Sequence, residues 1–144
     1  MNATFCTHHH RWLVVDDEPD LSELIALALG GIATEPVENL TSAPAALARL
    51  AQDPQSYDLL ITDRDMPQLD GLELARRAHT AAPRVKVILV SARVDDLTHE
   101  DLDRAGICGV VQKPFTLQSL TAAARPFVAL PTSTELSSLL QRAA

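Results

Sequence analysis

The sequence predicts an α/β fold in which five β-strands alternate with five α-helices around one parallel sheet. Short apolar runs without polar alternation occur at residues 12–15 and 59–61, and residues 85–90 are apolar apart from Lys86, which is typical of strands buried on both faces. A segment with the helical spacing of apolar residues follows each run after a short loop. Strands and helices that alternate in this way form a parallel sheet with helices on both of its faces.

The length and charge of the chain restrict its class. At 144 residues it is most simply a single domain with its own core. The net charge of −7 argues against a surface that binds nucleic acid directly. No run approaches the ~18 apolar residues of a membrane span, and no early apolar stretch reads as a signal peptide. We therefore expect a cytoplasmic protein without a membrane partner, in which Cys6 and Cys108 are free thiols.

We divide the chain into three parts. Residues 1–10 are expected to be a flexible N-terminal arm, residues 11–130 the domain, and residues 131–144 a tail or a short amphipathic helix.

Both end segments carry a pattern of their own. The histidine run at residues 8–10 fits a disordered arm or a tag remnant better than a metal site. Near the other end, Thr132–Glu135 is typical of a helix capping box, and Leu136, Leu139 and Leu140 follow it at helical spacing.

The first strand, at residues 12–15, leads into two aspartates, a glutamate and Pro19. Proline and acidic residues are typical of a loop that enters the first turn of a helix. Gly30 and Gly31 are expected to end this helix. Its expected apolar face consists of Leu21, Leu24, Ile25, Ala28 and Leu29.

The second strand, at residues 33–38, is weak. It contains Pro36, which has no N–H to donate to a neighbouring strand, so we place it at an edge of the sheet. Thr41 or Ser42 then caps the second helix, which has Pro44 in its first turn.

The central strand, at residues 57–63, ends abruptly in the acid Asp63. Pro67 and the pair Asp70 and Gly71 indicate a loop after it, and a third helix begins near Gly71.

The last third of the chain repeats the pattern twice. The strand at 85–90 precedes a helix over 95–105 with few apolar residues, which we expect to be mobile. A short strand at 109–111 follows, and Thr116 caps the final helix, with Pro126 near its end. The residues expected in register on that helix are Leu117, Leu120, Thr121, Ala124 and Val128.

Polar side chains follow the carboxyl ends of four predicted strands. They are Asp16 with Asp17, Asp63, Ser91 and Lys113. Sites in open parallel sheets form beyond these strand ends, so we expect the five side chains to converge.

Converging carboxylates repel one another, and a small hard cation such as Mg²⁺ relieves that repulsion. A cation together with a Lys ammonium can bind a phosphoryl group. A carboxylate can act as the nucleophile that accepts this group and become an aspartyl phosphate. The chain has ten Arg but only two Lys, so the lysine at position 113 indicates a need for a compact point charge.

The chain resembles the response regulator receiver domains, the CheY-like family with the flavodoxin-like (βα)5 fold. That family implies a doubly wound five-stranded sheet in the order 2-1-3-4-5. The motifs that carry the resemblance are Leu13–Glu18, Asp63–Pro67 with Asp70-Gly71, Val90–Ala92, and Lys113–Phe115. Each motif alone is weak, but all four in order at strand ends are specific.

The resemblance assigns a role to each site residue. Asp63 would be the phosphoacceptor, Asp17 the direct Mg²⁺ ligand, and Asp16 the acid that holds the metal largely through water. Asp65 would lend its backbone carbonyl to the metal. The remaining roles are a switch hydroxyl at Ser91 and the family's lysine at Lys113, whose bond to Pro114 is often cis in the family.

Two features depart from the family or vary within it. Val110 stands where the family usually has Tyr or Phe, so we do not expect an aromatic rotamer switch. Asp65 and Arg93 occupy positions that line the approach of water to the phosphoryl group. We expect them to pair and partly to cover Asp63.

The sequence leaves two alternatives open. Asp63 and Asp65 also resemble the Asp-x-Asp pair of haloacid-dehalogenase-type phosphatases, a reading that leaves Asp16 and Asp17 without a role. The second alternative is a pseudo-receiver that no longer takes phosphate. The preferred interpretation is a receiver that catalyses only its own phosphorylation and slow autodephosphorylation, and is otherwise not an enzyme.

The resemblance also implies partners. The phosphoryl donor would be a histidine kinase or a histidine phosphotransfer protein. A downstream effector or output domain would bind the face formed by residues 95–130. The chain could also form a homodimer.

Overall fold

The computed structural model describes residues 9–129, 137 and 140–143. The expectations for residues 1–8 and for the capping box of the tail lie outside the described residues. Five strands form one parallel sheet in the order β2-β1-β3-β4-β5, which confirms the expected fold class and strand order. The strands are β1 (Arg11–Val15), β2 (Glu38–Leu40), β3 (Tyr57–Asp63), β4 (Lys86–Ser91) and β5 (Ile107–Gln112).

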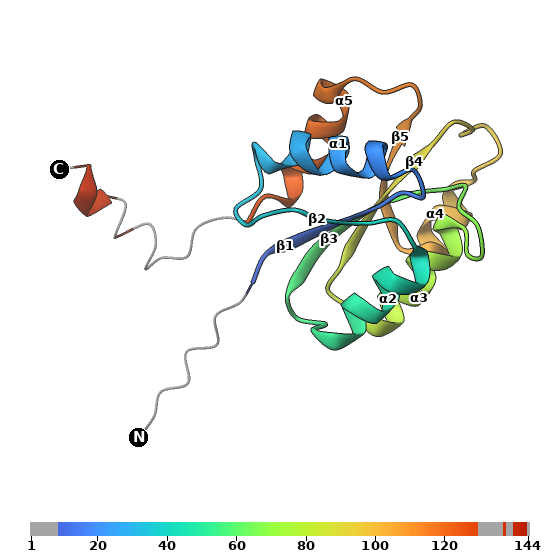
Figure 1. The fold of residues 1–144 in the computed structure, drawn as a ribbon, viewed down its shortest axis with the longest axis horizontal. Coiled ribbons are helices and arrows are strands. Elements are labelled where there is room, and N and C mark those ends of the chain that lie inside the picture. The colour runs from blue at the N-terminus through green and yellow to red at the C-terminus, as the bar shows by residue number, and fades with distance from the viewer. Residues whose placement is uncertain (1–8, 130–136, 138–139, 144) are drawn as a thin grey trace.

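Helices cover both faces of this sheet (Figure 1). On one face lie α1 (Pro19–Gly30) and α5 (Leu117–Ala124). On the other lie α2 (Ala43–Gln52), α3 (Gly71–Ala81) and α4 (His99–Ala105). None of the described helices is long and apolar enough to cross a membrane.

The core consists of two apolar layers, one on each side of the sheet. Successive side chains of a strand point to opposite faces, so Leu13 joins the layer under α2 and α3, while Val14 joins the layer under α1 and α5. The central strand divides in the same way, with Leu60 in the first layer and Ile61 in the second. The runs lack alternation because both faces of the sheet are buried.

Three boundaries differ by four or five residues from those expected, and β5 is longer at both ends than the expected 109–111. Strand β2 begins at Glu38, beyond Pro36, because the chain pairs with β1 only after the residue that lacks an N–H. Its place at the edge is as predicted. Helix α4 begins at His99 rather than Asp95, because Thr98 caps it. Helix α5 ends at Ala124, where a 3-10 turn with Pro126 takes over.

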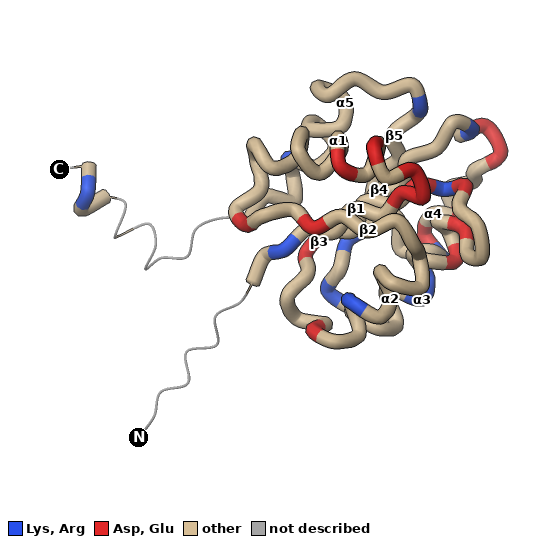
Figure 2. Tube along the Cα trace, viewed as in Figure 1, with Lys and Arg blue, Asp and Glu red and all other residues tan. Residues whose placement is uncertain are grey.

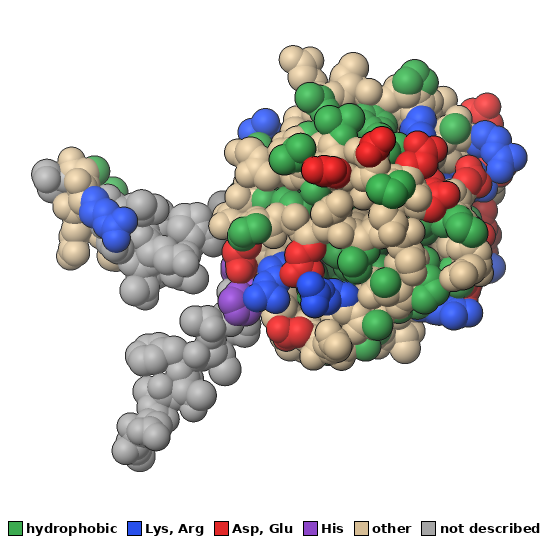
Figure 3. Space-filling view, in the orientation of Figure 1, with side chains coloured by type: hydrophobic (Ala, Val, Ile, Leu, Met, Phe, Trp, Pro, Cys, Tyr) green, Lys and Arg blue, Asp and Glu red, His purple; other side chains and the backbone are tan. Residues whose placement is uncertain are grey.

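Two leucines expected on buried helix faces are exposed. Leu24 of α1 and Leu117 of α5 are 48% and 53% exposed. The buried residues of α1 are Ser22, Ile25, Ala26 and Leu29. At about 100° per residue, the centre of this buried stripe lies roughly 150° around the helix from Leu24, so Leu24 points away from the sheet. Hydrophobic side chains are accordingly visible on the surface over α1 (Figure 3).

The last two residues of the expected arm contact the domain. His9 lies 2.9 Å from a carboxylate oxygen of Glu35, and His10 lies 2.7 Å from a carboxylate oxygen of Asp58. Within the described residues, neither histidine belongs to a group of three or more side chains that could hold a metal ion.

Candidate functional site

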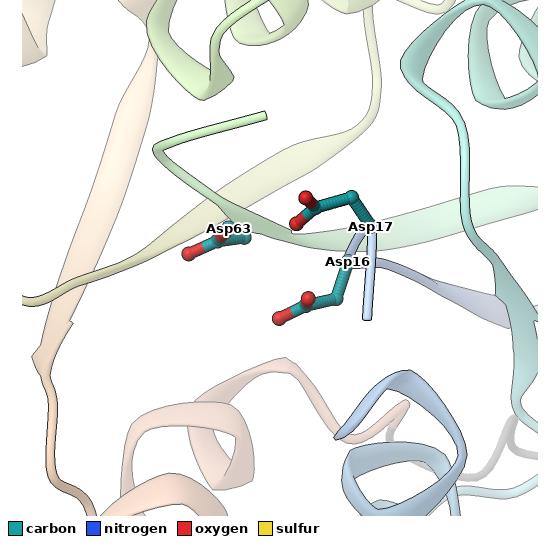
Figure 4. A group of neighbouring side chains, drawn as sticks. All are labelled: Asp16, Asp17 and Asp63. Carbon is teal, nitrogen blue, oxygen red and sulfur yellow. The ribbon is translucent and has the colours of Figure 1, made fainter. Parts of the chain in front are cut away.

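Three carboxylates meet where β1 and β3 end. The two strands pair in parallel, with Val15 opposite Thr62, so the residues that follow them come out side by side. One carboxylate oxygen from each of Asp16, Asp17 and Asp63 lies within 4.8 Å of the other two (Figure 4). Asp16 and Asp63 are buried, and Asp17 is exposed. Acidic segments near the start of α1 add to the negative charge here (Figure 2).

Asp16 occupies an unfavourable environment for a charge. Its Oδ1 accepts a hydrogen bond of 2.9 Å from the backbone N–H of Glu18. Its Oδ2 is buried and has no hydrogen-bond partner among the described residues. Burial raises the pKa of Asp16 to about 6, and repulsion from Asp63 and Asp17 adds to this, against the lowering effects of the Glu18 N–H and Lys113.

Lys113 supplies the positive charge of the site. It follows β5, and its Nζ lies 2.9 Å from Asp63 Oδ1 and 3.8 Å from Asp16 Oδ2. Burial alone would lower the pKa of Lys113, but the hydrogen bond and the attraction of Asp63, with that of Asp16, outweigh it and raise this pKa. The Lys113–Pro114 peptide bond is cis. The Lys113 N–H also donates to the Ser91 carbonyl, at 2.8 Å.

Ser91, at the end of β4, is buried. Its hydroxyl donates to the carbonyl oxygen of Arg93 at 2.6 Å and accepts from the Arg93 N–H at 3.1 Å. In this structure the hydroxyl is therefore engaged with its own loop. Val110 belongs to β5, where it pairs with Leu89 of β4. Its side chain packs against the core layer under α2 and α3.

Asp65 and Arg93 lie outside the group of three acids. Their side chains form an ion pair at 3.6 Å and are 59% and 70% exposed. The expected ion pair is therefore present and largely exposed, and its covering of Asp63 stays a prediction.

The β3–α3 connection packs tightly behind Asp63. Asp70 caps α3 by accepting a hydrogen bond of 2.8 Å from the Glu73 N–H. The Gly71 N–H donates to the Arg64 carbonyl at 2.8 Å. A Cβ on Gly71 would lie 2.4 Å from the backbone oxygen of Asp63, so only glycine fits at this position.

The structure also shows a site residue that sequence reasoning missed. Arg64, directly after Asp63, forms a two-pronged ion pair with Asp96 in the loop between β4 and α4. The only signal in the sequence was an arginine placed directly after a buried strand.

Comparison with known proteins agrees with this geometry. The family model "Response regulator receiver domain" matches residues 12–125. The receiver protein CpdR of Brucella abortus is 33% identical over 110 residues, which is 76% of this chain and 89% of CpdR. The protein PilR of Pseudomonas aeruginosa is 32% identical over 110 residues, which is 75% of this chain but only 24% of PilR.

Solved structures show the same fold. A receiver domain protein of Clostridium thermocellum is 27% identical, with a TM-score of 0.68, over 91% of this chain and 98% of that one. The chemotaxis protein CheY4 of Vibrio cholerae has a TM-score of 0.73 at 19% identity, over 83% of this chain and 99% of that one.

The fold, the acid group and the family match define a receiver of two-component signalling. The chain belongs to the response regulator receiver family. Domains of this family act in signalling rather than as conventional enzymes, interact with histidine kinases and output domains, and generally bind Mg²⁺ at an acidic pocket. This membership removes the haloacid-dehalogenase-type phosphatase alternative.

Proposed function

We propose that Asp63 accepts a phosphoryl group from a phosphohistidine and that Lys113 holds that group in place. The observation that carries this proposal is the contact of 2.9 Å between Lys113 Nζ and Asp63 Oδ1, beside two further carboxylates. A partly buried lysine placed against a buried aspartate at a strand end provides a nucleophile and a cation for a phosphoryl group.

The residues fit a divalent cation. The buried Oδ2 of Asp16 has no hydrogen-bond partner among the described residues, and the pKa of its carboxyl is raised. Both features are expected of a ligand set that a cation completes. Asp17 and Asp63 would bind the ion directly, Asp16 largely through water, and Asp65 through its backbone carbonyl. When bound, Mg²⁺ would neutralise the negative charge that the acids and the phosphoryl oxygens share.

Asp63 reacts as the nucleophile. One of its carboxylate oxygens attacks the phosphorus of the phosphohistidine, so an O–P bond forms as the P–N bond breaks, and the imidazole leaves with the bonding electrons. Lys113 then moves its ammonium group from the carboxylate to a phosphoryl oxygen. Both groups are already in contact, so little reorganisation is needed.

Ser91 would respond to this event. Its hydroxyl would turn from the Arg93 carbonyl toward a phosphoryl oxygen on Asp63. Val110 leaves no aromatic ring to follow that movement, so the signal would pass through the backbone of the β4–α4 loop. The surface formed by residues 95–130 would then meet an effector, an output domain or a second copy of the chain.

The pair formed by Asp65 and Arg93 would control how long the phosphoryl group survives. Both side chains are largely exposed, and Asp65 lies two residues beyond Asp63, where we expect water to approach the phosphoryl group. We expect Arg93→Ala to accelerate autodephosphorylation severalfold, measured as loss of the phosphoryl adduct after the donor is removed. An unchanged rate would show that this pair does not shield Asp63.

The proposed function is tested by incubating the protein with Mg²⁺ and acetyl phosphate and measuring its intact mass. We expect one phosphoryl adduct that requires Mg²⁺. Rapid repeated release of free phosphate without accumulation of the adduct would contradict the relay function. A folded, Mg²⁺-binding protein without an adduct, also with a phosphorylated histidine donor, would indicate a pseudo-receiver.

A further inference from the structure

Arg64 joins the phosphoacceptor strand to the loop that precedes α4. Its Nη1 and Nη2 donate to the two carboxylate oxygens of Asp96 at 2.8 and 2.7 Å. The same Nη1 donates to the carbonyl oxygen of Arg93 at 2.7 Å. The backbone of Arg64 is fixed as well, because its N–H donates to the Val90 carbonyl at 2.9 Å. One side chain therefore holds the β4–α4 loop at two points.

The carbonyl of Arg93 is also the acceptor for the Ser91 hydroxyl. A carbonyl oxygen has two lone pairs and can accept from both donors, but a serine hydroxyl has only one proton. Ser91 cannot donate to Arg93 and to a phosphoryl group on Asp63 at the same time. Any contact that holds the Arg93 carbonyl in this place therefore favours the state in which Ser91 faces its own loop.

The pair formed by Arg64 and Asp96 is the stronger of the two that cross between these loops. The Arg64 side chain is only 13% exposed, and the contact is bidentate. The pair formed by Arg93 and Asp65 is long, at 3.6 Å, and both of its partners are largely exposed. Ion pairs of that second kind contribute little to holding a structure in place.

Resting on the proposed function, we propose that Arg64 and Asp96 form a resting-state latch that phosphorylation of Asp63 must release. The latch fixes the loop from Arg93 to Asp96 and, through the Arg93 carbonyl, keeps the Ser91 hydroxyl away from the acceptor. Its release frees the carbonyl, the hydroxyl and the start of α4, whose cap Thr98 lies two residues beyond Asp96. The latch thus performs the coupling that an aromatic side chain at Val110 would otherwise provide.

The test measures the affinity for beryllium fluoride, a phosphoryl mimic, by calorimetry with Mg²⁺ present. Asp96→Asn breaks the bidentate pair at an exposed carboxylate. Because the latch opposes the bound state, we expect the variant to bind the mimic about fivefold more tightly. Asp95→Asn removes the same charge one residue away and should bind as the wild type does. Arg64→Lys keeps the positive charge but cannot form the bidentate contact, so its affinity for the mimic should lie between those of the other two variants.

Hydrogen exchange supplies the second readout. In the mimic-free Asp96→Asn protein, the N–H groups of Arg93 and Leu97, which are hydrogen-bonded within this loop, should exchange faster than in the wild type. Equal affinity of Asp96→Asn and wild type for the mimic would overturn the latch. Failure of the wild type itself to bind the mimic would instead refute the assignment of Asp63 on which the latch depends.

Discussion

Asp16→Asn should make the metal-free protein more stable, because the wild-type carboxylate is buried beside like charges. The substitution removes the charge and keeps the Oδ1 that accepts from the Glu18 N–H. Asparagine also leaves the size of the side chain almost unchanged. The change in stability therefore reports the cost of the charge rather than of a lost contact.

The size of the effect follows from the pKa of Asp16, which rises from 3.8 to about 6 on folding. Two units at about 1.4 kcal/mol each give at most about 3 kcal/mol, and water around the exposed Asp17 reduces this to about 1–2 kcal/mol. Between these two pKa values the folded state binds the extra proton. The wild type therefore loses this stability as the pH rises from about 4 to above 6, and the variant does not.

The assay is urea unfolding of both proteins between pH 4 and 8, first in EDTA and then in Mg²⁺. At pH 8 in EDTA the variant should be more stable by about 1–2 kcal/mol, and near pH 4 the two should be nearly equal. Mg²⁺ should stabilise the wild type more than the variant. Asp17→Asn is the matched control, which should lose the response to Mg²⁺ and keep the pH dependence. A variant that is less stable than wild type at pH 8 in EDTA would refute the reasoning.

Three further substitutions test other parts of the site. Gly71→Ala should destabilise the fold by about 3 kcal/mol or more in urea unfolding, because the new Cβ meets the Asp63 backbone oxygen at 2.4 Å; a loss below about 1 kcal/mol would contradict that contact. Asp70→Ala should cost about 1 kcal/mol by the same measurement through loss of the α3 cap, and no change would show that the cap is dispensable. Lys113→Gln should raise the pKa of Asp16 further, followed by carboxyl NMR titration, and a lowered pKa would show that Lys113 does not stabilise this charge.

Most of the fold could be predicted because the sequence marks both the strands and their ends. Continuous apolar runs indicated strands buried on both faces, and the acids after two of them indicated where those strands stop. The predicted position of β2 was wrong because this strand has only three residues, too few to give a clear pattern in the sequence. Leu24 and Leu117 were wrongly predicted to be buried. The buried face of a helix depends on how the helix lies on the sheet, and the spacing of its apolar residues does not determine this.

The site also has parts that the sequence predicted and parts that it did not. Asp16, Asp17, Asp63 and Lys113 could be brought together from topology alone, since parallel strands place their carboxyl ends at one edge. The contact of Arg64 with Asp96 could not, because it depends on the path of an irregular loop and on the rotamer of a long side chain. The orientation of the Ser91 hydroxyl is equally a matter of loop geometry.

The measurement that tests the central claim most directly is to locate the phosphoryl group within the chain. Protein treated with Mg²⁺ and acetyl phosphate would be reduced with borohydride, which converts an aspartyl phosphate to homoserine, and then digested for peptide sequencing by mass spectrometry. We expect homoserine at position 63 and at no other aspartate, and no reduction product in Asp63→Asn. Homoserine at position 16, 17 or 65 instead, or a product that persists in Asp63→Asn, would contradict it.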